Sequence, residues 1–214
     1  MFRENKEIFN ILSESVTEGL VVVDKDQKIV WVNSAAEEMF GYNKGELLSK
    51  SLNVLIPQNY HHSHDKYIKK YFEKTSKRRM GSDRELYAIR KDKKKFPVEV
   101  GLSPVKKGDF DFTMALVIDI TERKKLETLK KNQNHILELI AQNHSIDTVL
   151  NNIVHLLEEQ LNDTYISISC CNEDKKTLLT LVAPSLPNAY QQKVNGLKIE
   201  NSTGSCGTAA YRKE

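Results

Sequence analysis

The feature that most constrains the fold is a strand that passes directly into a long helix near the middle of the chain. Residues 112–118 are apolar and rich in the aromatic and β-branched side chains that favour strands. A charged segment with helical spacing starts at Asp119, and no glycine or proline follows before Pro184. A strand that continues into a helix without a break can pass a change in one domain to the next. We therefore expect a signalling protein rather than an enzyme core.

The sequence before this junction predicts an antiparallel sheet with helices on one face. Strands are expected at residues 20–23, 29–32, 84–90, 95–105 and 110–118. The fourth of these alternates apolar and polar residues, which is the pattern of a half-buried strand. A helix is expected between the second and third strands at residues 60–73, where apolar residues recur at spacings of three and four. The predicted fold class is α+β, with a five-stranded antiparallel sheet and flanking helices.

Residues 121–144 predict a linker helix. Its apolar positions recur at coiled-coil-like spacing and are Leu126, Leu129, Ile136 and Ile140. Gln133 occupies the skipped position of the pattern. We expect this helix to join two copies of the chain as a homodimer.

Composition excludes several classes of protein. The net charge is only +3, from 32 basic and 29 acidic residues, so we expect no nucleic-acid partner. The three cysteines form no C-x-x-C motif, and reduced thiols in a cytoplasmic protein account for them. We expect no membrane contact, because no apolar run reaches the roughly 20 residues of a membrane span. The first residues carry charge and lack the apolar region of a signal peptide.

Five short motifs follow one another before the linker helix. They are Gly19-x4-Asp24, Ile29-x3-Asn33, Phe40-Gly41-Tyr42-x3-Glu46-Leu47, Arg90-Lys91-Asp92-x3-Phe96-Pro97 and Asp119-Ile120-Thr121-Glu122-Arg123-Lys124. In this order they resemble the PAS (sensory-box) family. The resemblance implies a PAS domain at residues 8–120, which binds a small ligand, a cofactor or a partner chain. Asp119, Thr121, Leu126 and Leu129 are then the expected signalling junction.

Two residues depart from the usual pattern of the family. Ser49 stands where glycine is usual after Glu-Leu-Leu, and Lys93 stands where the family has Asp-Gly. Neither serine nor lysine adopts a positive φ without cost. We therefore expect these two turns to differ from those of the family.

One stretch is similar to the haem-binding oxygen-sensor kinase type (FixL-like) within that family. It reads Ile56-Pro57-x2-Tyr60-x3-His64-Asp65-x-Tyr67-Ile68-x2-Tyr71 and is followed by Arg84 and Phe96-Pro97. The resemblance implies that His64 is the axial ligand of haem iron and that Arg84 is the distal residue that binds oxygen. The other residues expected at the haem are Tyr67, Lys70, Val100 and Leu102. The alternative is a structural His64 that packs on the sheet and holds the helix.

Residues 145–214 are similar to the first part of a GAF domain, on the strength of a helix, a hairpin after Tyr165 and the turn Gly204-Ser-Cys-Gly207. We expect no catalysis within these residues. The expected function is the sensory input module of a bacterial signal-transduction protein. Its effector, a histidine kinase or a cyclic-di-GMP enzyme, is expected beyond Glu214. The alternative is a PAS/GAF dimerisation module without a ligand.

Overall fold

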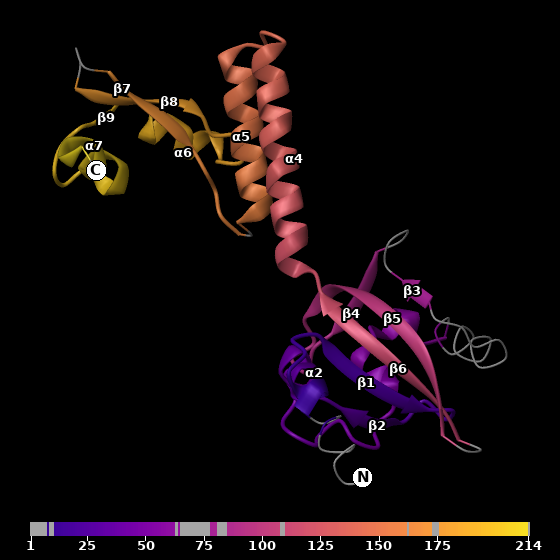
Figure 1. Ribbon diagram of the computed structural model, residues 1–214. Helices are drawn as coiled ribbons and strands as arrows, with labels where there is room; N and C mark the ends of the chain where they lie inside the picture. Colours follow the sequence, from indigo (N-terminus) through magenta and orange to yellow (C-terminus); the bar gives the residue numbers. More distant parts are fainter. Residues whose placement is uncertain are drawn as a thin grey trace. The chain divides into compact units, whose positions relative to one another are not determined.

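The chain forms two compact units, Met1–Leu126 and Glu127–Glu214 (Figure 1). The computed structural model describes residues 8, 11–62, 64, 78–80, 85–107, 110–161, 163–172 and 176–213. Within these ranges, no helix has the length and apolar character needed to cross a membrane.

The first unit is built on one antiparallel sheet. Its strands are β1 (Gly19–Asp24), β2 (Ile29–Val32), β3 (Arg78–Met80), β4 (Leu86–Ile89), β5 (Lys95–Lys107) and β6 (Phe110–Asp119). The order is β2-β1-β6-β5-β3, and β4 also pairs with β5. Because β4 pairs with residues 95–98 of β5 and β3 with residues 100–102, the two short strands share one edge of the sheet. Since β3 and β4 occupy the same edge, the sheet is five strands wide, as the sequence predicts. Strand β3 itself was not expected.

Helix α2 (Ser34–Phe40) packs on β1, and both ends of the helix are set by the sequence. Asn33 caps the first turn, since its Oδ1 accepts a hydrogen bond from the backbone of Ala36 at 3.0 Å. Gly41 ends the helix in the left-handed region with φ of 73°. Gly19 permits close packing, because a Cβ at this position would lie 3.3 Å from the Cα of Ala36.

The predicted helix at residues 60–73 lies largely outside the described residues. Two short 3-10 helices, Leu52–Leu55 and Gln58–Tyr60, lead into it. His61, His62 and His64 are helical, which agrees with the prediction as far as the structure describes this segment.

The core of the first unit lies between α2 and one face of the sheet. Its most buried apolar side chains include Val21, Ile29, Phe40, Leu47, Phe96 and Val98. The rings of Phe40 and Phe96 meet edge to face with centroids 5.6 Å apart. Along β5, Phe96 and Val98 are buried and Val100 and Leu102 are half-buried, so the predicted alternation places these four residues on the core face.

The two turns that depart from the family pattern both contain a residue with positive φ. Ser49 has a φ of 63° and Lys93 has a φ of 71°, so both adopt the conformation that glycine adopts most easily. The replacement of the family's usual glycine has therefore not removed the positive φ at either turn. Backbone hydrogen bonds hold the turn at Lys93. The amide of Lys93 donates to the carbonyl of Arg90, and the amide of Arg90 donates to the carbonyl of Lys94.

The second unit joins a helix pair to a small sheet. Helix α4 (Thr121–Ala141) begins in the first unit, and α5 (Ile146–Gln160) lies beside it in Figure 1. The remaining elements are β7 (Ile168–Asn172), β8 (Thr177–Val182), α6 (Asn188–Val194), β9 (Leu197–Lys198) and α7 (Gly204–Arg212). The antiparallel sheet has the order β7-β8-β9 and contains the predicted hairpin. The assignment of this unit to the GAF family stays a prediction.

Candidate functional site: the strand-to-helix junction

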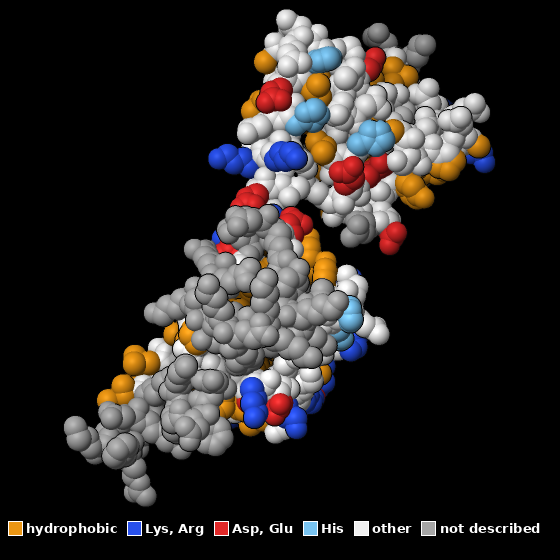
Figure 2. Space-filling model, turned by 90° about the vertical axis from the view of Figure 1, so that its right-hand side faces the viewer, with side chains coloured by type: hydrophobic (Ala, Val, Ile, Leu, Met, Phe, Trp, Pro, Cys, Tyr) orange, Lys and Arg blue, Asp and Glu red, His pale blue; other side chains and the backbone are white. Residues whose placement is uncertain are grey.

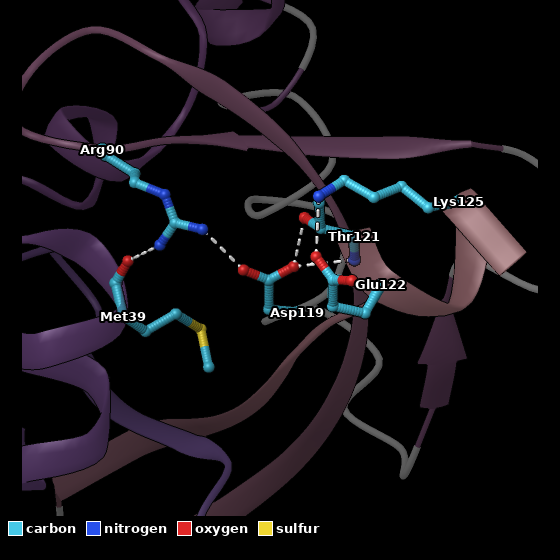
Figure 3. Close-up of polar contacts among 6 residues, drawn as sticks. All are labelled: Met39, Arg90, Asp119, Thr121, Glu122 and Lys125. Carbon is cyan, nitrogen blue, oxygen red and sulfur yellow. Dashed lines mark hydrogen bonds and ion pairs between the residues drawn. The ribbon is translucent and has the colours of Figure 1, made fainter. Parts of the chain in front are cut away.

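Asp119 is the point at which the sheet of the first unit connects to α4. It is the last residue of β6 and pairs with Val98 of β5. One carboxylate oxygen, Oδ1, accepts hydrogen bonds from the backbone N–H of Thr121 at 2.8 Å and from its hydroxyl at 2.5 Å (Figure 3). Asp119 therefore satisfies an amide at the start of α4 that has no partner within the helix.

Arg90 ties this junction to the rest of the first unit. Its Nη2 donates to Oδ2 of Asp119 at 2.6 Å, and its Nη1 donates to the backbone carbonyl of Met39 in α2 (Figure 3). The guanidinium also lies 3.9 Å from the centroid of the Phe96 ring, which is close enough for a cation–π contact. One side chain thus contacts α2, the core and the last residue of β6, which in turn caps the start of α4.

The electrostatics of the junction keep Asp119 ionised. Burial by itself would raise the pKa of the Asp119 carboxyl. The two hydrogen bonds from Thr121 and the positive charge of Arg90 outweigh burial and hold the pKa below its usual value. Both partners of the ion pair are only partly accessible, with side-chain exposures of 30% for Arg90 and 25% for Asp119. Water therefore screens this pair less than it screens a fully exposed one.

The first turn of α4 is attached to the sheet by further contacts. Ile120 is buried, and its amide donates to the carbonyl of Pro97 at 3.1 Å. Arg123 forms an ion pair with the buried carboxylate of Glu99 in β5. Lys124 reaches Glu85, just before β4, at 3.1 Å. A shift of β4 or β5 would therefore act on the first turn of α4 through these contacts.

A second set of contacts fixes the turn between β4 and β5 to the end of α2. The amide of Lys91 donates to the carbonyl of Phe40 at 2.9 Å, and its ammonium lies 2.7 Å from Glu46. The hydrogen bond from Lys91, with help from the Asn43 amide and Lys50, lowers the pKa of Glu46 to about 2. The turn that follows Arg90 is thus held in place independently of Asp119.

The residues predicted to surround a haem are only partly described. Val100 and Leu102 lie side by side on the core face of β5, where they pair with Val117 and Ala115 of β6. His64 is half-buried at the end of the described helical turn. Tyr67, Lys70 and Arg84 lie outside the described residues. The structure therefore offers one imidazole and an apolar sheet face, which are groups that a haem requires.

The other histidines of this turn have different surroundings. Nε2 of His61 lies 2.8 Å from the carbonyl oxygen of Ile56, which ties that ring to the preceding turn. His62 is exposed. Among the described residues, no group of three or more His, Cys, Asp or Glu side chains could hold a metal ion.

The outer surface of α4 carries an apolar stripe. Leu126, Leu129, Leu137 and Ile140 are between 54% and 66% exposed. With Gln133 they follow one another at steps of three, four, four and three, which places them on one face of a helix. Ile136, predicted to belong to this stripe, is instead half-buried, and Leu137 takes its place. We call these five residues the α4 stripe.

Comparison with known proteins identifies the first unit. Residues 17–122 match the protein family described as PAS domain. Together with the five-position antiparallel sheet, this match decides the assignment. Residues 17–122 form a PAS domain. A PAS domain is a sensory module that has no catalytic activity of its own.

Three curated proteins are similar in sequence to parts of the chain. A "Methyl sulfide methyltransferase-associated sensor" from Methanosarcina acetivorans is 34% identical over 49% of this chain and 10% of its own length. "Sensor protein FixL" from Bradyrhizobium diazoefficiens is 25% identical over 81% of this chain and 33% of its own length. "Oxygen sensor protein DosP" from Escherichia coli is 30% identical over 59% of this chain and 15% of its own length. The chain thus spans a third or less of the length of these relatives.

The contacts that connect the PAS domain to α4 were only partly foreseen. Asp119 and Thr121 were predicted at the junction, and the structure brings them together with Arg90. Arg90 belongs to a PAS motif in the sequence, but nothing in that motif indicates its partner. The one available signal is its position, since a charged residue that directly follows an apolar strand must turn toward a polar group. Glu99 carries a similar signal, as an acidic residue within an apolar strand.

Proposed function

We propose that the PAS domain is the sensory input module of a signal-transduction protein and that the Asp119 junction relays its state into α4. The observation that carries the proposal is the position of Asp119, whose two oxygens bind Arg90 and Thr121 at once. Any ligand that changes the position of β6 relative to α2 changes this pair of contacts. Such a ligand shifts the population of junction arrangements by its difference in affinity for them.

Strand β5 supports the relay from a second direction. Val98 and Val100 face the core, whereas Glu99 between them faces the opposite side and binds Arg123. Neighbouring residues of a strand point to opposite faces, so a ligand that displaces the core face of β5 also displaces the anchor of α4.

The relay is tested in the parent protein by measuring effector output across its range of stimulus. Arg90→Gln and Asp119→Asn should hold output at one level, because each breaks the Arg90–Asp119 bond through which Met39 of α2 is linked to the residue that caps α4. Lys125→Gln is the control, since the ion pair of Lys125 is with the exposed Glu122 at the surface of α4. A full response in both junction variants would contradict the proposed relay.

The α4 stripe supports a homodimer in which two copies of the chain pack along this helix. Four exposed apolar side chains on one helix face are costly in water, and burial returns about 25 cal/mol per Å² of apolar surface. Gln133 in the middle of the stripe would align the two helices, as buried polar residues do in coiled coils. Figure 2 shows hydrophobic side chains reaching the surface of the second unit between charged ones.

Sedimentation velocity tests the homodimer. Leu129→Asp should shift the chain to monomer, because it places a charge within the stripe. Asn134→Asp adds the same charge to an exposed position of α4 outside the stripe and should leave association unchanged. If Leu129→Asp associates as the wild type does, the stripe is not the dimer contact.

A second candidate function is oxygen sensing through haem, with His64 as the axial ligand. It is favoured by the similarity to a protein named as an oxygen sensor and by the half-buried position of His64. Bound haem would supply an iron centre for a diatomic gas, with the imidazole of His64 holding it and Val100 and Leu102 forming an apolar wall. Arg84, Tyr67 and Lys70 are proposed as further contacts on the basis of the sequence alone.

Absorption spectroscopy tests the haem proposal. Protein produced with added iron and haem precursor should show a Soret band that is lost in His64→Ala and kept in His62→Ala, which removes an exposed neighbour. A colourless wild-type protein would exclude haem and leave the relay proposal intact. We further propose a cytoplasmic location and, as effector of the parent protein, either a histidine kinase or a cyclic-di-GMP enzyme.

A further inference from the structure

The start of α4 is attached to the PAS domain by charged side chains rather than by apolar burial. None of the residues of α4, all of which the structure describes, is buried, and Leu126 near its start is exposed. Two ion pairs instead reach the sheet side, one from Arg123 to Glu99 of β5 and one from Lys124 to Glu85 at 3.1 Å. The attachment of this part of the helix therefore depends on the strength of charge pairs.

The basic residues of the first turns lie where a helix disfavours positive charge. Aligned peptide dipoles place about half a positive charge at a helix N-terminus, so cations there are destabilising. Arg123, Lys124 and Lys125 are the third, fourth and fifth residues of α4. Lys125 is balanced within the helix by Glu122 at 2.8 Å (Figure 3). Arg123 and Lys124 are balanced by carboxylates outside the helix, so the helix start loses this balance if it leaves the sheet.

Both pairs are open to dissolved ions. The Arg123 side chain is 50% exposed, and the exposures of Lys124 and Glu85 are 41% and 60%. Salt shortens the range of interactions between exposed charges from about 10 Å at about 0.1 M to about 3 Å at about 1 M. The Lys124–Glu85 pair should weaken most, because neither partner is buried. The pair of Arg123 should weaken less, since the carboxylate of Glu99 is buried.

The contacts on the strand side of the junction resist salt. Ile120, the residue before α4, is buried, and its amide donates to a carbonyl of β5 at 3.1 Å. The burial of an apolar side chain does not depend on charge, so dissolved ions do not screen it. The Arg90–Asp119 pair is also less accessible than the pair of Lys124. Salt should therefore act on the first turns of α4 and leave the end of β6 in place.

We propose that the start of α4 responds to ionic strength, because salt releases residues 121–126 from the sheet while Ile120 and β6 stay in place. This inference rests on the proposed relay, in which α4 carries the output, and it adds an input that requires no ligand. Attached and released helix starts are two states of the junction. Salt shifts their populations, because it weakens contacts that only the attached state makes.

Hydrogen exchange at two salt concentrations tests the proposal in the full 214-residue chain. The amides of residues 121 and 124, which donate to Asp119 and to the carbonyl of Ile120, are followed by NMR in about 0.05 M and about 1 M KCl. We expect these amides of the wild type to exchange about two- to fivefold faster at the higher concentration, which is the range that exposed ion pairs allow. The amides of β1 should exchange equally in both solutions.

Lys124→Gln identifies the ion pair that is responsible. This variant should exchange rapidly in both solutions and lose most of the salt response, because its charge pair with Glu85 is absent. Lys125→Gln is the matched control, since it removes a neighbouring charge whose pair lies within the helix, and it should keep the salt response. Exchanging the two charges, with Glu85→Lys and Lys124→Glu together, should restore the salt response.

The outcomes separate this input from the relay. Exchange that does not depend on salt in the wild type would overturn the proposal, as would a full salt response in Lys124→Gln or none in the charge-exchanged variant. Sucrose at the osmolality of the KCl solution should not speed exchange. If it does, water activity rather than charge screening is responsible, and the proposal is wrong. A failure of the relay is seen separately, as a full effector response in Arg90→Gln, and does not alter the salt dependence of exchange.

Discussion

The guanidinium of Arg90 lies 2.6 Å from the carboxylate of Asp119, although the two residues are 29 positions apart in the chain. With its second N–H donor, Arg90 holds the backbone of Met39 near the end of α2. The same carboxylate binds the first residue of α4 through Thr121. The pair therefore connects a helix of the PAS domain to the helix that leaves it, and its state depends on the position of both.

Loss of the Arg90 side-chain charge should destabilise the PAS domain. We expect Arg90→Gln to lower the free energy of unfolding by about 1–3 kcal/mol, because it removes a charged hydrogen bond from a partly buried carboxylate. Urea denaturation measures the change. Lys94→Gln is the matched control, since Lys94 forms an exposed pair with Asp92 at 3.7 Å. The control should change stability by less than about 0.5 kcal/mol. Equal effects of the two substitutions would contradict the role of Arg90.

The lowered pKa of Asp119 predicts how this contribution depends on pH. An unfolded aspartate titrates near a pKa of about 3.9, and the folded carboxyl titrates below that value. The stabilisation is therefore fully present above about pH 4 and is lost as the pH falls through the folded pKa. Urea titrations from pH 7 downward should show the stability difference between the wild type and Asp119→Asn shrinking only in this acidic range. A difference that shrinks near neutral pH would show that another group is responsible.

Asn33 should be among the most sensitive positions of the PAS domain. Its amide is fully buried and makes four hydrogen bonds, accepting from Leu20 and Ala36 and donating to the carbonyls of Ser13 and Glu18. Asn33→Ala leaves these groups without partners, so we expect a loss of about 3 kcal/mol or more.

Thermal and urea unfolding measure the effect of Asn33→Ala. The exposed Asn43 is the control, because Asn43→Ala should cost less than about 0.5 kcal/mol. Asn33→Asp should also be destabilising, since aspartate keeps the acceptors and loses both donors. If Asn33→Asp is as stable as the wild type, the hydrogen bonds to Ser13 and Glu18 contribute little.

Lys93 predicts a stabilising substitution. Its φ of 71° costs a non-glycine residue about 1–2 kcal/mol, and glycine would relieve this strain. Part of the relief is offset by the extra conformational freedom of glycine in the unfolded chain. We expect Lys93→Gly to raise the free energy of unfolding by up to about 1 kcal/mol. Lys94→Gly, next to it at ordinary φ, should lower it. A loss of stability in Lys93→Gly would mean that the lysine side chain makes a contribution larger than the backbone strain.

The parts of the fold that depend on local patterns were predictable from sequence. The alternation around Phe96 and Val98 identified the core face of β5, and Gly41 marked the end of α2. These features follow from side-chain period and from the backbone freedom of glycine. Asn33 belongs to one of the five sequence motifs, but nothing in that motif indicates its hydrogen bonds to the carbonyls of Ser13 and Glu18.

The contacts that define the junction depend on tertiary structure and could not be read from the sequence. Glu99 and Arg123 are 24 positions apart, and many charged residues could have paired with either. Within helix α4, the sequence pattern likewise did not determine which apolar residues are exposed. A coiled-coil period favoured Ile136, whereas the partial burial of Ile136 leaves Leu137 on the exposed face. Position along the helix alone did not distinguish these neighbours.

Hydrogen exchange of the first turn of α4 measures whether Arg90 and Asp119 hold this turn in place. The amides of residues 121–125 are measured by mass spectrometry or NMR in the wild type, Arg90→Gln and the control Lys125→Gln. We expect Arg90→Gln, although it changes no residue of α4, to speed exchange in this turn several-fold, because Asp119 loses the partner that positions it. Lys125→Gln should leave exchange at the wild-type rate. Unchanged exchange in Arg90→Gln, with the domain still folded, would contradict the claim that the PAS domain controls α4 through Asp119.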